Sequence, residues 1–560
     1  MRGLSWIRDP ITTKELSGLA RGWQPYAARG LYIGLFGIVV WTYVSGISSQ
    51  ERLWLSQSTL ANLGQKVVIT FLPLQMGLVI LTAISSASDL VTKELRMGTL
   101  GLLVCTPLTP WRVALGKWRA AVLQSLTLLF SGVPILGACS ALGGVTPRDI
   151  VAILTLSAAG ASLGAAIALL CSSLFRSATT SLLVATGLFV AYLLLPVLAS
   201  ENGRQYSLEF ALLGYLHVLP ALVALLIPQG RIDAPEAWIS AAVVTGGLSL
   251  LLLRVTAARL TALTVRTPAP PLLTRTFDRL DRFYEGFGPE RFRQVRLFSG
   301  SSGVWDQRAI LWKELKTRAS GRLRNSVRIA VGFLVILSLF MSDLTTVEYA
   351  AWVTTVLLWF MALANGASLF VTEKEERKWD LLLVTPLRSA DILTAKLLAG
   401  IVPVLPMVAT VWCFWAVQVG VGMLRSGEVL LVIAAVGLPA LAAYLAGAAA
   451  SLKARSLRAA FTLALSAMTA LILFVPWLIQ ELAPRLDLPV LASLDEDVHR
   501  PWIDRVGMLR EVNDHGWRRW TNSDTRHPEV FSFGLAYLVL SGSILAYLYR
   551  RFNRVTGRSE

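Results

Sequence analysis

The chain has 560 residues, of which 54% are hydrophobic and only 16% are charged, and its mean hydropathy is +0.59. Long apolar runs at this composition exclude a soluble globular protein and indicate an integral membrane protein. The formal net charge is +17. The basic residues lie between apolar runs rather than in one compact domain, which is typical of cytoplasmic loops and argues against nucleic-acid binding.

The N-terminal stretch is amphipathic and has no apolar core of the kind found in signal peptides, so no cleaved signal peptide is expected. Residues 6–24 and 305–324 are both basic and contain the pattern Trp-x4-Ile-x2-Lys-Glu-Leu. Each stretch predicts a helix that lies in the headgroup layer of a bilayer, here called the elbow helix. A membrane anchor explains either stretch alone, whereas the repeated Lys-Glu pair favours a contact with the next cytoplasmic loop.

Apolar runs of about 20 residues, the length that crosses a bilayer as a helix, recur along the chain. The sequence predicts an all-α protein with about six spans in each half and about twelve in all. Their approximate ranges are 31–49, 66–87, 119–142, 150–175, 178–199, 237–255, 327–342, 349–371, 397–422, 429–451, 458–479 and 530–549.

The basic residues between these runs all fall on one side of the predicted membrane, which must then be cytoplasmic. Both termini are expected on that side, so the two halves form a parallel repeat. We predict a first unit at 1–256, a basic cytoplasmic linker at 257–304 with a Thr-Pro-Ala-Pro-Pro run, and a second unit at 305–560. The chain is expected to be a multi-pass protein of the inner (plasma) membrane.

One charged segment occurs in both units. Glu94–Leu108 aligns without a gap on Glu373–Leu387 at an offset of 279 residues, and Lys117 matches Lys396 at the same offset. The segments 88–117 and 367–396 join the second predicted span to the third. Each is interpreted as a short helix that ends before a Thr-Pro pair, because a residue before proline disfavours α geometry. A loop that only obeys the positive-inside rule does not explain the repeated glutamates, since that rule concerns Lys and Arg.

Two external regions differ between the units. Residues 205–230 form an apolar run that Pro220 interrupts, and we interpret it as a re-entrant hairpin before the sixth span. Residues 480–529 are polar, with mixed charge, and are interpreted as an external insertion.

The segment between spans two and three, with the Lys-Glu-Leu elbow before it, resembles permeases of ATP-binding cassette (ABC) transporters of the type 2 exporter class. The resemblance covers most of the chain as two tandem units. It implies that each unit has an elbow helix, six spans, a coupling helix between spans two and three, and a re-entrant external hairpin. The second unit departs from this pattern, since it has the polar insertion and carries Arg377 and Lys378 where the first has Gly98 and Thr99. Unequal contacts with a partner are therefore expected.

The resemblance implies that the chain is not itself an enzyme and that ATP and Mg²⁺ bind to a partner. The sequence contains no Gly-x4-Gly-Lys-Ser/Thr P-loop. Two copies of a P-loop ATPase are expected to dock on the two coupling segments. The predicted coupling residues are Glu94, Gly98, Thr99, Thr106, Pro107, Leu108 and Lys117 in the first unit, and Glu373, Glu375, Asp380, Thr385, Pro386, Leu387 and Lys396 in the second. The predicted elbow residues are Lys14, Glu15, Lys313 and Glu314.

No catalytic residue, metal site or cofactor is predicted on this chain, and the four cysteines lack CxxC spacing. The expected surroundings are the lipid bilayer and an accessory external protein.

Three alternatives stay open. A twelve-helix secondary carrier would also have parallel halves, but such carriers keep ionisable groups in the bundle, and only His217 lies within an apolar run. A membrane-embedded enzyme would use the acids and histidines of 480–529. An anchor that recruits an ATPase for signalling or motility would show the same sequence features as an exporter.

Overall fold

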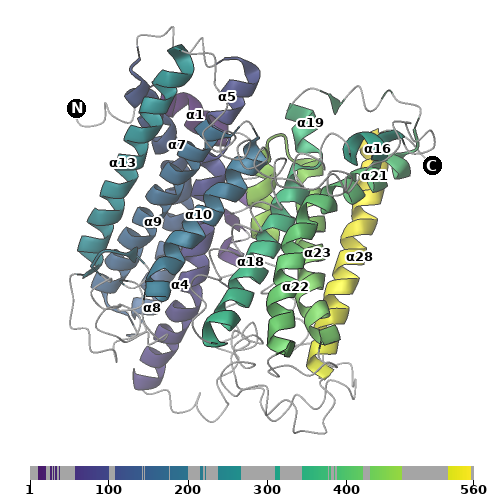
Figure 1. Ribbon diagram of the computed structural model, residues 1–560. Coiled ribbons are helices and arrows are strands. Elements are labelled where there is room, and N and C mark those ends of the chain that lie inside the picture. Colours follow the sequence, from purple (N-terminus) through teal and green to yellow (C-terminus); the bar gives the residue numbers. More distant parts are fainter. Residues whose placement is uncertain are drawn as a thin grey trace.

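The computed structural model is all-α throughout the residues that it describes, which confirms the predicted fold class. Figure 1 shows helices of the first unit forming one bundle and helices of the second unit forming another beside it. The described residues are 10–20, 26–27, 29–30, 32–34, 37, 57–99, 108–141, 143, 145–175, 177–199, 215–218, 221, 237–265, 309–315, 344–375, 378–379, 384, 387–420, 429–468 and 528–556.

In the first unit, the long helix α9 lies at the centre and packs against its neighbours α4, α7, α10 and α13. Its start is fixed by sequence: Thr146 and Asp149 form a capping box, and Pro147 occupies the first turn, where its missing N–H costs no helical bond. The helices of this unit are α1 (Pro10–Ala20), α4 (Gln57–Ala87), α5 (Thr92–Met97), α7 (Pro110–Ser131), α8 (Val133–Ala141), α9 (Pro147–Leu174), α10 (Ala178–Ala199) and α13 (Ala237–Val265).

In the second unit, α23 takes the place of α9 and packs against α18 and α28. The helices are α16 (Ala309–Glu314), α18 (Leu344–Ser368), α19 (Val371–Glu375), α21 (Ser389–Ile401), the 3₁₀ turn η4 (Val402–Val404), α22 (Leu405–Gly420), α23 (Val429–Lys453) and α28 (Pro528–Thr556). A further apolar helix covers Leu457–Met468.

Six stretches among the described residues are long and apolar enough to cross a membrane. They are Gln75–Met97, Pro110–Ala141, Pro147–Leu174, Ala237–Ala262, Ser389–Cys413 and Val436–Lys453. Shorter apolar helices at Ala178–Leu193, Thr354–Ser368 and Leu457–Met468 also lie where spans were predicted. Predicted spans at 31–49 (for the most part) and 327–342, most of the hairpin at 205–230 and the insertion at 480–529 up to residue 527 lie outside the described residues. Residues 528 and 529 of that insertion belong to α28.

The structure corrects two local predictions. Helix α13 continues to Val265, so residues 257–265 extend the sixth helix and do not belong to the linker. The helix has no breaker before Thr267-Pro268, which explains its length. The third spans are also not single helices. The first is divided between α7 and α8 at Gly132, and the second passes through η4 at Pro403, where proline lacks the N–H that a helix interior needs.

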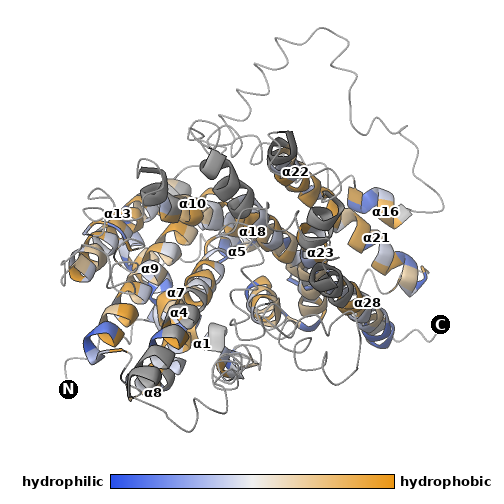
Figure 2. Cartoon of the chain, turned by 90° about the horizontal axis from the view of Figure 1, so that it is seen from below, coloured by the Kyte–Doolittle hydropathy of each residue, from blue (hydrophilic) through white to orange (hydrophobic). Residues whose placement is uncertain are grey.

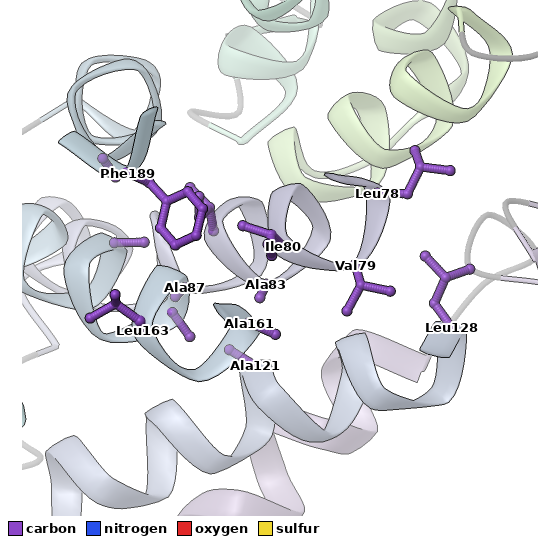
Figure 3. Packing of buried hydrophobic residues seen from close by; sticks show 14 of the residues in the cluster. Leu78, Val79, Ile80, Ala83, Ala87, Ala121, Leu128, Ala161, Leu163 and Phe189 are labelled. Atoms are coloured by element: carbon purple, nitrogen blue, oxygen red, sulfur yellow. The ribbon is translucent and has the colours of Figure 1, made fainter. Parts of the chain in front are cut away.

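Small residues let the central helices approach closely. Ala83 and Ala87 of α4 lie beside Ala161 of α9 in the largest buried cluster (Figure 3), and such small residues are common where membrane helices meet. That cluster continues into α18 of the second unit. Figure 2, which looks nearly along the helix axes, shows α10 and α18 side by side between the two bundles.

Candidate coupling site

In the first unit, Lys117 near the start of α7 lies at the centre of a buried ion cluster. Its Nζ lies 2.8 Å from Oε1 of Glu94 on α5 and 3.1 Å from Oε1 of Glu15 on α1. The ammonium also donates to the carbonyl oxygen of Leu90 at 3.2 Å. The three donors of the lysine thus have three acceptors, on α1, on α5 and in the turn between α4 and α5. We call Glu15, Glu94 and Lys117 the first triad.

The second unit has the same arrangement. Nζ of Lys396 on α21 lies 2.6 Å from Oε1 of Glu373 on α19 and 3.2 Å from Oε1 of Glu314 on α16. The lysine side chains are 1% and 0% exposed in the first and second clusters. We call Glu314, Glu373 and Lys396 the second triad. Both triads lie at the end of the molecule that carries α1, α5, α16 and α19, called here the α5–α19 end (Figure 1).

Local sequence explains how each glutamate reaches its lysine. Helix α1 packs on α7, and α16 packs on α21, which places the elbow glutamate against the third span. Helix α5 ends at Gly98, whose φ of 70° suits glycine because it has no Cβ. Beyond the helix, the Thr99 N–H donates to the Glu94 carbonyl at 3.0 Å, and the Lys378 N–H donates to the Glu373 carbonyl at 2.9 Å. The two units therefore close this turn identically although their sequences differ here.

The coupling segments are also attached to the fourth spans, by different donors. In the first unit, the Thr92 hydroxyl donates to the carbonyl oxygens of Ser172 and Phe175 at 2.9 and 3.2 Å. At the equivalent place in the second unit, Lys374 Nζ donates to the carbonyl oxygens of Ser451, Leu452 and Ala454 at 2.5 to 3.3 Å. Carbonyls at a helix C-terminus lack intrahelical partners and attract cations, so either donor satisfies them.

Two regions of the chain, residues 28–282 and 307–501, match the model of a family described as ABC-2 family transporter protein. This chain belongs to the ABC-2 transporter family. The first matched region covers most of the first unit and part of the predicted linker, and the second lies within the second unit. Together they cover most of the sequence, as a tandem ABC-2 permease requires. No curated protein matched the chain in a separate comparison.

Membership makes the chain the multi-pass membrane component of an ABC transporter, a transport subunit that is not itself catalytic. It also implies a partner that binds ATP. The resemblance inferred from the coupling segments is thereby confirmed.

In this ABC-2 permease, the first triad affects the titration of Glu15. Burial raises the pKa of the Glu15 carboxyl, but the charge of Lys117 and its hydrogen bond outweigh burial and hold that pKa below its ordinary value. Glu15 is therefore ionised, and opposite Lys117, at neutral pH. Outside the triads, burial lowers the pKa of the Lys374 ammonium to about 8.

The structure brings together six of the predicted site residues as the two triads and places the others elsewhere. Glu94 and Glu373 are buried and face lysines, so their carboxylates are not on an exposed docking surface. Lys14 and Lys313 are exposed, and thus only the glutamate of each Lys-Glu pair joins a triad. Leu108 and Leu387 pack at the edges of the buried clusters. The other predicted coupling residues Thr106, Pro107, Asp380, Thr385 and Pro386 lie outside the described residues.

The ABC-2 permease also contains ion pairs between its units that sequence reasoning missed. Arg96 Nη2 lies 2.9 Å from Glu375 Oε2, and Arg458 Nε lies 3.0 Å from Asp89 Oδ1. Arg96 and Glu375 occupy equivalent positions of the repeat, since they are 279 residues apart. The alignment therefore contained a signal for the first pair, because a two-fold arrangement brings a position near the axis against its own equivalent.

His217 is the remaining ionisable group singled out in an apolar run. Its Nε2 lies 2.8 Å from the carbonyl oxygen of Tyr192, and its ring stacks on the Tyr192 ring at 4.0 Å. The histidine therefore holds the described part of the predicted hairpin, residues 215–218, against α10.

Proposed function

We propose that this chain forms the translocation path of an ATP-driven exporter in the inner (plasma) membrane, with both termini cytoplasmic. In this proposal, one P-loop ATPase subunit docks beneath each coupling segment, giving one permease chain with two ATPase chains. The observation that carries the proposal is the duplicated triad. The same three charges join the elbow helix, the coupling segment and the third span in both units.

The triads support coupling because of what they connect. A displacement of α5 moves Glu94 and so acts directly on Lys117 of α7 and, through it, on Glu15 of α1. Breaking a buried ion pair costs about 3–5 kcal/mol, so moving the three elements together is favoured over pulling them apart. A push from below a coupling segment would then tilt the third span with the elbow helix, as alternating access between the two units requires.

The side chains next to the triads are suited to meet a partner. Arg96 and Met97 are exposed in the first coupling segment, and Lys378 and Val384 are exposed in the second. Lys378 carries a charge where the first unit has the neutral Thr99, which supports unequal contacts with the two ATPase subunits. An accessory external protein would contact the insertion at 480–529.

The test is affinity purification of the tagged chain from its native membrane in mild detergent, followed by mass spectrometry. We expect a co-purifying P-loop ATPase that is lost when Thr106-Pro107 and Thr385-Pro386 are replaced by alanines. A matched control replaces Thr146-Pro147, a Thr-Pro pair at the opposite end of the first unit, and should retain the partner. Recovery of the chain alone, with ATP present, would contradict the proposal and favour the carrier or the membrane-embedded enzyme.

A further inference from the structure

The two units are joined at the α5–α19 end by a connected set of charges. Glu375 uses both carboxylate oxygens: Oε2 pairs with Arg96 of the first unit, and Oε1 accepts from the Leu457 N–H at 3.0 Å. The next residue, Arg458, pairs with Asp89 of the first unit. The first unit is therefore held at two points by adjacent parts of the second.

The repeat shows that only one of these two contacts is symmetric. Arg96 and Glu375 are equivalent positions, so their pair maps onto itself when the units are exchanged. The offset of 279 relates Asp89 to Ser368 and Arg458 to Thr179. The positions equivalent to this ion pair therefore carry two hydroxyl side chains, one on α18 and one on α10, and these two helices pack against each other.

All four of these side chains are largely withdrawn from solvent. Asp89, Ser368 and Thr179 are 2%, 0% and 3% exposed, and the Arg458 side chain is 13% exposed. A carboxylate and a guanidinium in such surroundings resist separation, because each would be left as an uncompensated charge. Hydroxyl groups carry a smaller penalty when separated, since they are neutral and gain water.

We propose that the two units separate asymmetrically at their α5–α19 ends. The side at Ser368 and Thr179 opens, while the Asp89–Arg458 ion pair stays closed and acts as the hinge. We call this arrangement the one-sided latch. Opening of the path is then asymmetric although the units are repeats. Arg96, which is 26% exposed, and Glu375 lie at equivalent positions, and their ion pair breaks as the hinge turns. The inference concerns motion within this chain and does not depend on the identity of the ATPase.

Matched distance measurements test the latch. Spin labels are placed on full-length chain in lipid nanodiscs, in a background with Cys105, Cys139, Cys171 and Cys413 replaced. One labelled pair, Lys93 with Ser456, flanks the Asp89–Arg458 contact. The other pair, Thr372 with Ser177, occupies the equivalent positions 279 residues away and flanks Ser368 and Thr179. We expect a narrow distance distribution for the first pair and a longer, broader one for the second.

Substitutions at the four positions of the latch provide a second test of the proposal. Asp89→Asn should raise the fraction of long Lys93–Ser456 distances by roughly tenfold, and exchanging the charges in Asp89→Arg with Arg458→Asp should reverse most of that rise. Grafting the pair onto the other side, with Ser368→Asp and Thr179→Arg, should narrow the Thr372–Ser177 distribution.

Ser368→Ala with Thr179→Ala is the control and should change neither pair. Equal distributions on the two sides of the wild-type chain would overturn the proposal. So would an Asp89→Asn variant that leaves the Lys93–Ser456 distances unchanged.

Discussion

Lys396 Nζ lies 2.6 Å from Glu373 Oε1, inside the protein at the point where the coupling segment of the second unit meets the third span. Lys117 and Glu94 make the same contact in the first unit at 2.8 Å. A buried ion pair gives little net stability over an apolar pair of the same shape, because both charges lose their hydration. Its occurrence in both units therefore points to a role in fixing geometry.

The lysines give the first prediction. Lys117→Met leaves Glu15 and Glu94 as buried carboxylates without their cation, and Lys396→Met does the same to Glu314 and Glu373. Each change should lower the free energy of unfolding by about 3–5 kcal/mol, measured by thermal unfolding in nanodiscs. Lys14→Met, on the exposed side of the same elbow helix, should stay within about 0.5 kcal/mol of the wild type. A melting temperature raised by Lys117→Met would contradict the interpretation that this lysine compensates the charges of two buried glutamates.

A neutral triad separates stability from positioning. Combining Lys117→Met with Glu15→Gln and Glu94→Gln removes all three charges, and such replacements are often neutral. We expect this variant to recover much of the stability lost by Lys117→Met. If the triad positions the coupling segment, the recovered protein should still stimulate its partner's ATP hydrolysis less than the wild type does. Full stimulation of ATP hydrolysis would show that the triad contributes to folding and not to coupling.

The sequence predicted which positions correspond but not where their side chains lie. The offset of 279 related Lys117 to Lys396 and Glu94 to Glu373. Whether a glutamate after a second span faces a partner or a lysine of its own chain depends on tertiary packing, which no local pattern records. Lys14 and Glu15 are neighbours in sequence, and only the packing of α1 on α7 decides that the glutamate is the inner one.

The contacts missed from the sequence are those in which the units differ. Lys374 was attributed to the positive-inside bias, whereas it replaces the Thr92 hydroxyl as the donor to the fourth span. Asp89 and Arg458 have no charged equivalents, so the repeat offered no sign of their pairing. The span positions were predictable because apolar runs of sufficient length have few other stable arrangements.

The exchange of donors gives the second prediction. Lys374→Met deprives three carbonyl oxygens of a donor, and the loss should be about 1–3 kcal/mol. Val371 occupies the position of Thr92 in the repeat and is fully buried. Adding Val371→Thr, which changes a methyl group into a hydroxyl at nearly constant volume, should recover about 1 kcal/mol. Thermal unfolding of both variants measures this difference. A further loss of stability when Val371→Thr is added would show that the coupling segments pack differently on the fourth spans of the two units.

The titration of Lys374 gives the third prediction. Burial lowers its pKa in the folded protein to about 8 from an ordinary value of 10.5. Between these values the unfolded chain binds more protons than the folded chain, so the free energy of unfolding rises with pH. Below about pH 8 the lysine is protonated in both states and contributes no slope. The melting temperature of the wild type should therefore rise relative to that of Lys374→Met from about pH 7.5 to about pH 9.5. Parallel curves for the two proteins would show that Lys374 keeps an ordinary pKa.

The fourth prediction concerns the crossing of α18 and α23, where two glycines bring the helix backbones into contact. A Cβ on Gly447 would clash with the Leu363 carbonyl oxygen and lie 2.7 Å from the Ala367 nitrogen. A Cβ on Gly366 would meet the backbone of Tyr444 and lie 3.1 Å from the Ala448 nitrogen. Backbone atoms cannot turn aside as a side chain can, so the helices must separate to admit a methyl group.

We expect Gly447→Ala to destabilise the protein by about 1–3 kcal/mol, the usual cost of overpacking. Gly437 lies on the same helix, and a Cβ added to it would meet nothing within 4 Å, so Gly437→Ala should be neutral or stabilise by up to about 1 kcal/mol through helix propensity. The first unit has Ala87 and Ala168 at the positions of Gly366 and Gly447, so backbone contact through these two glycines is specific to the second unit. Equal melting temperatures for Gly447→Ala and Gly437→Ala would mean that α18 and α23 lie farther apart in the membrane.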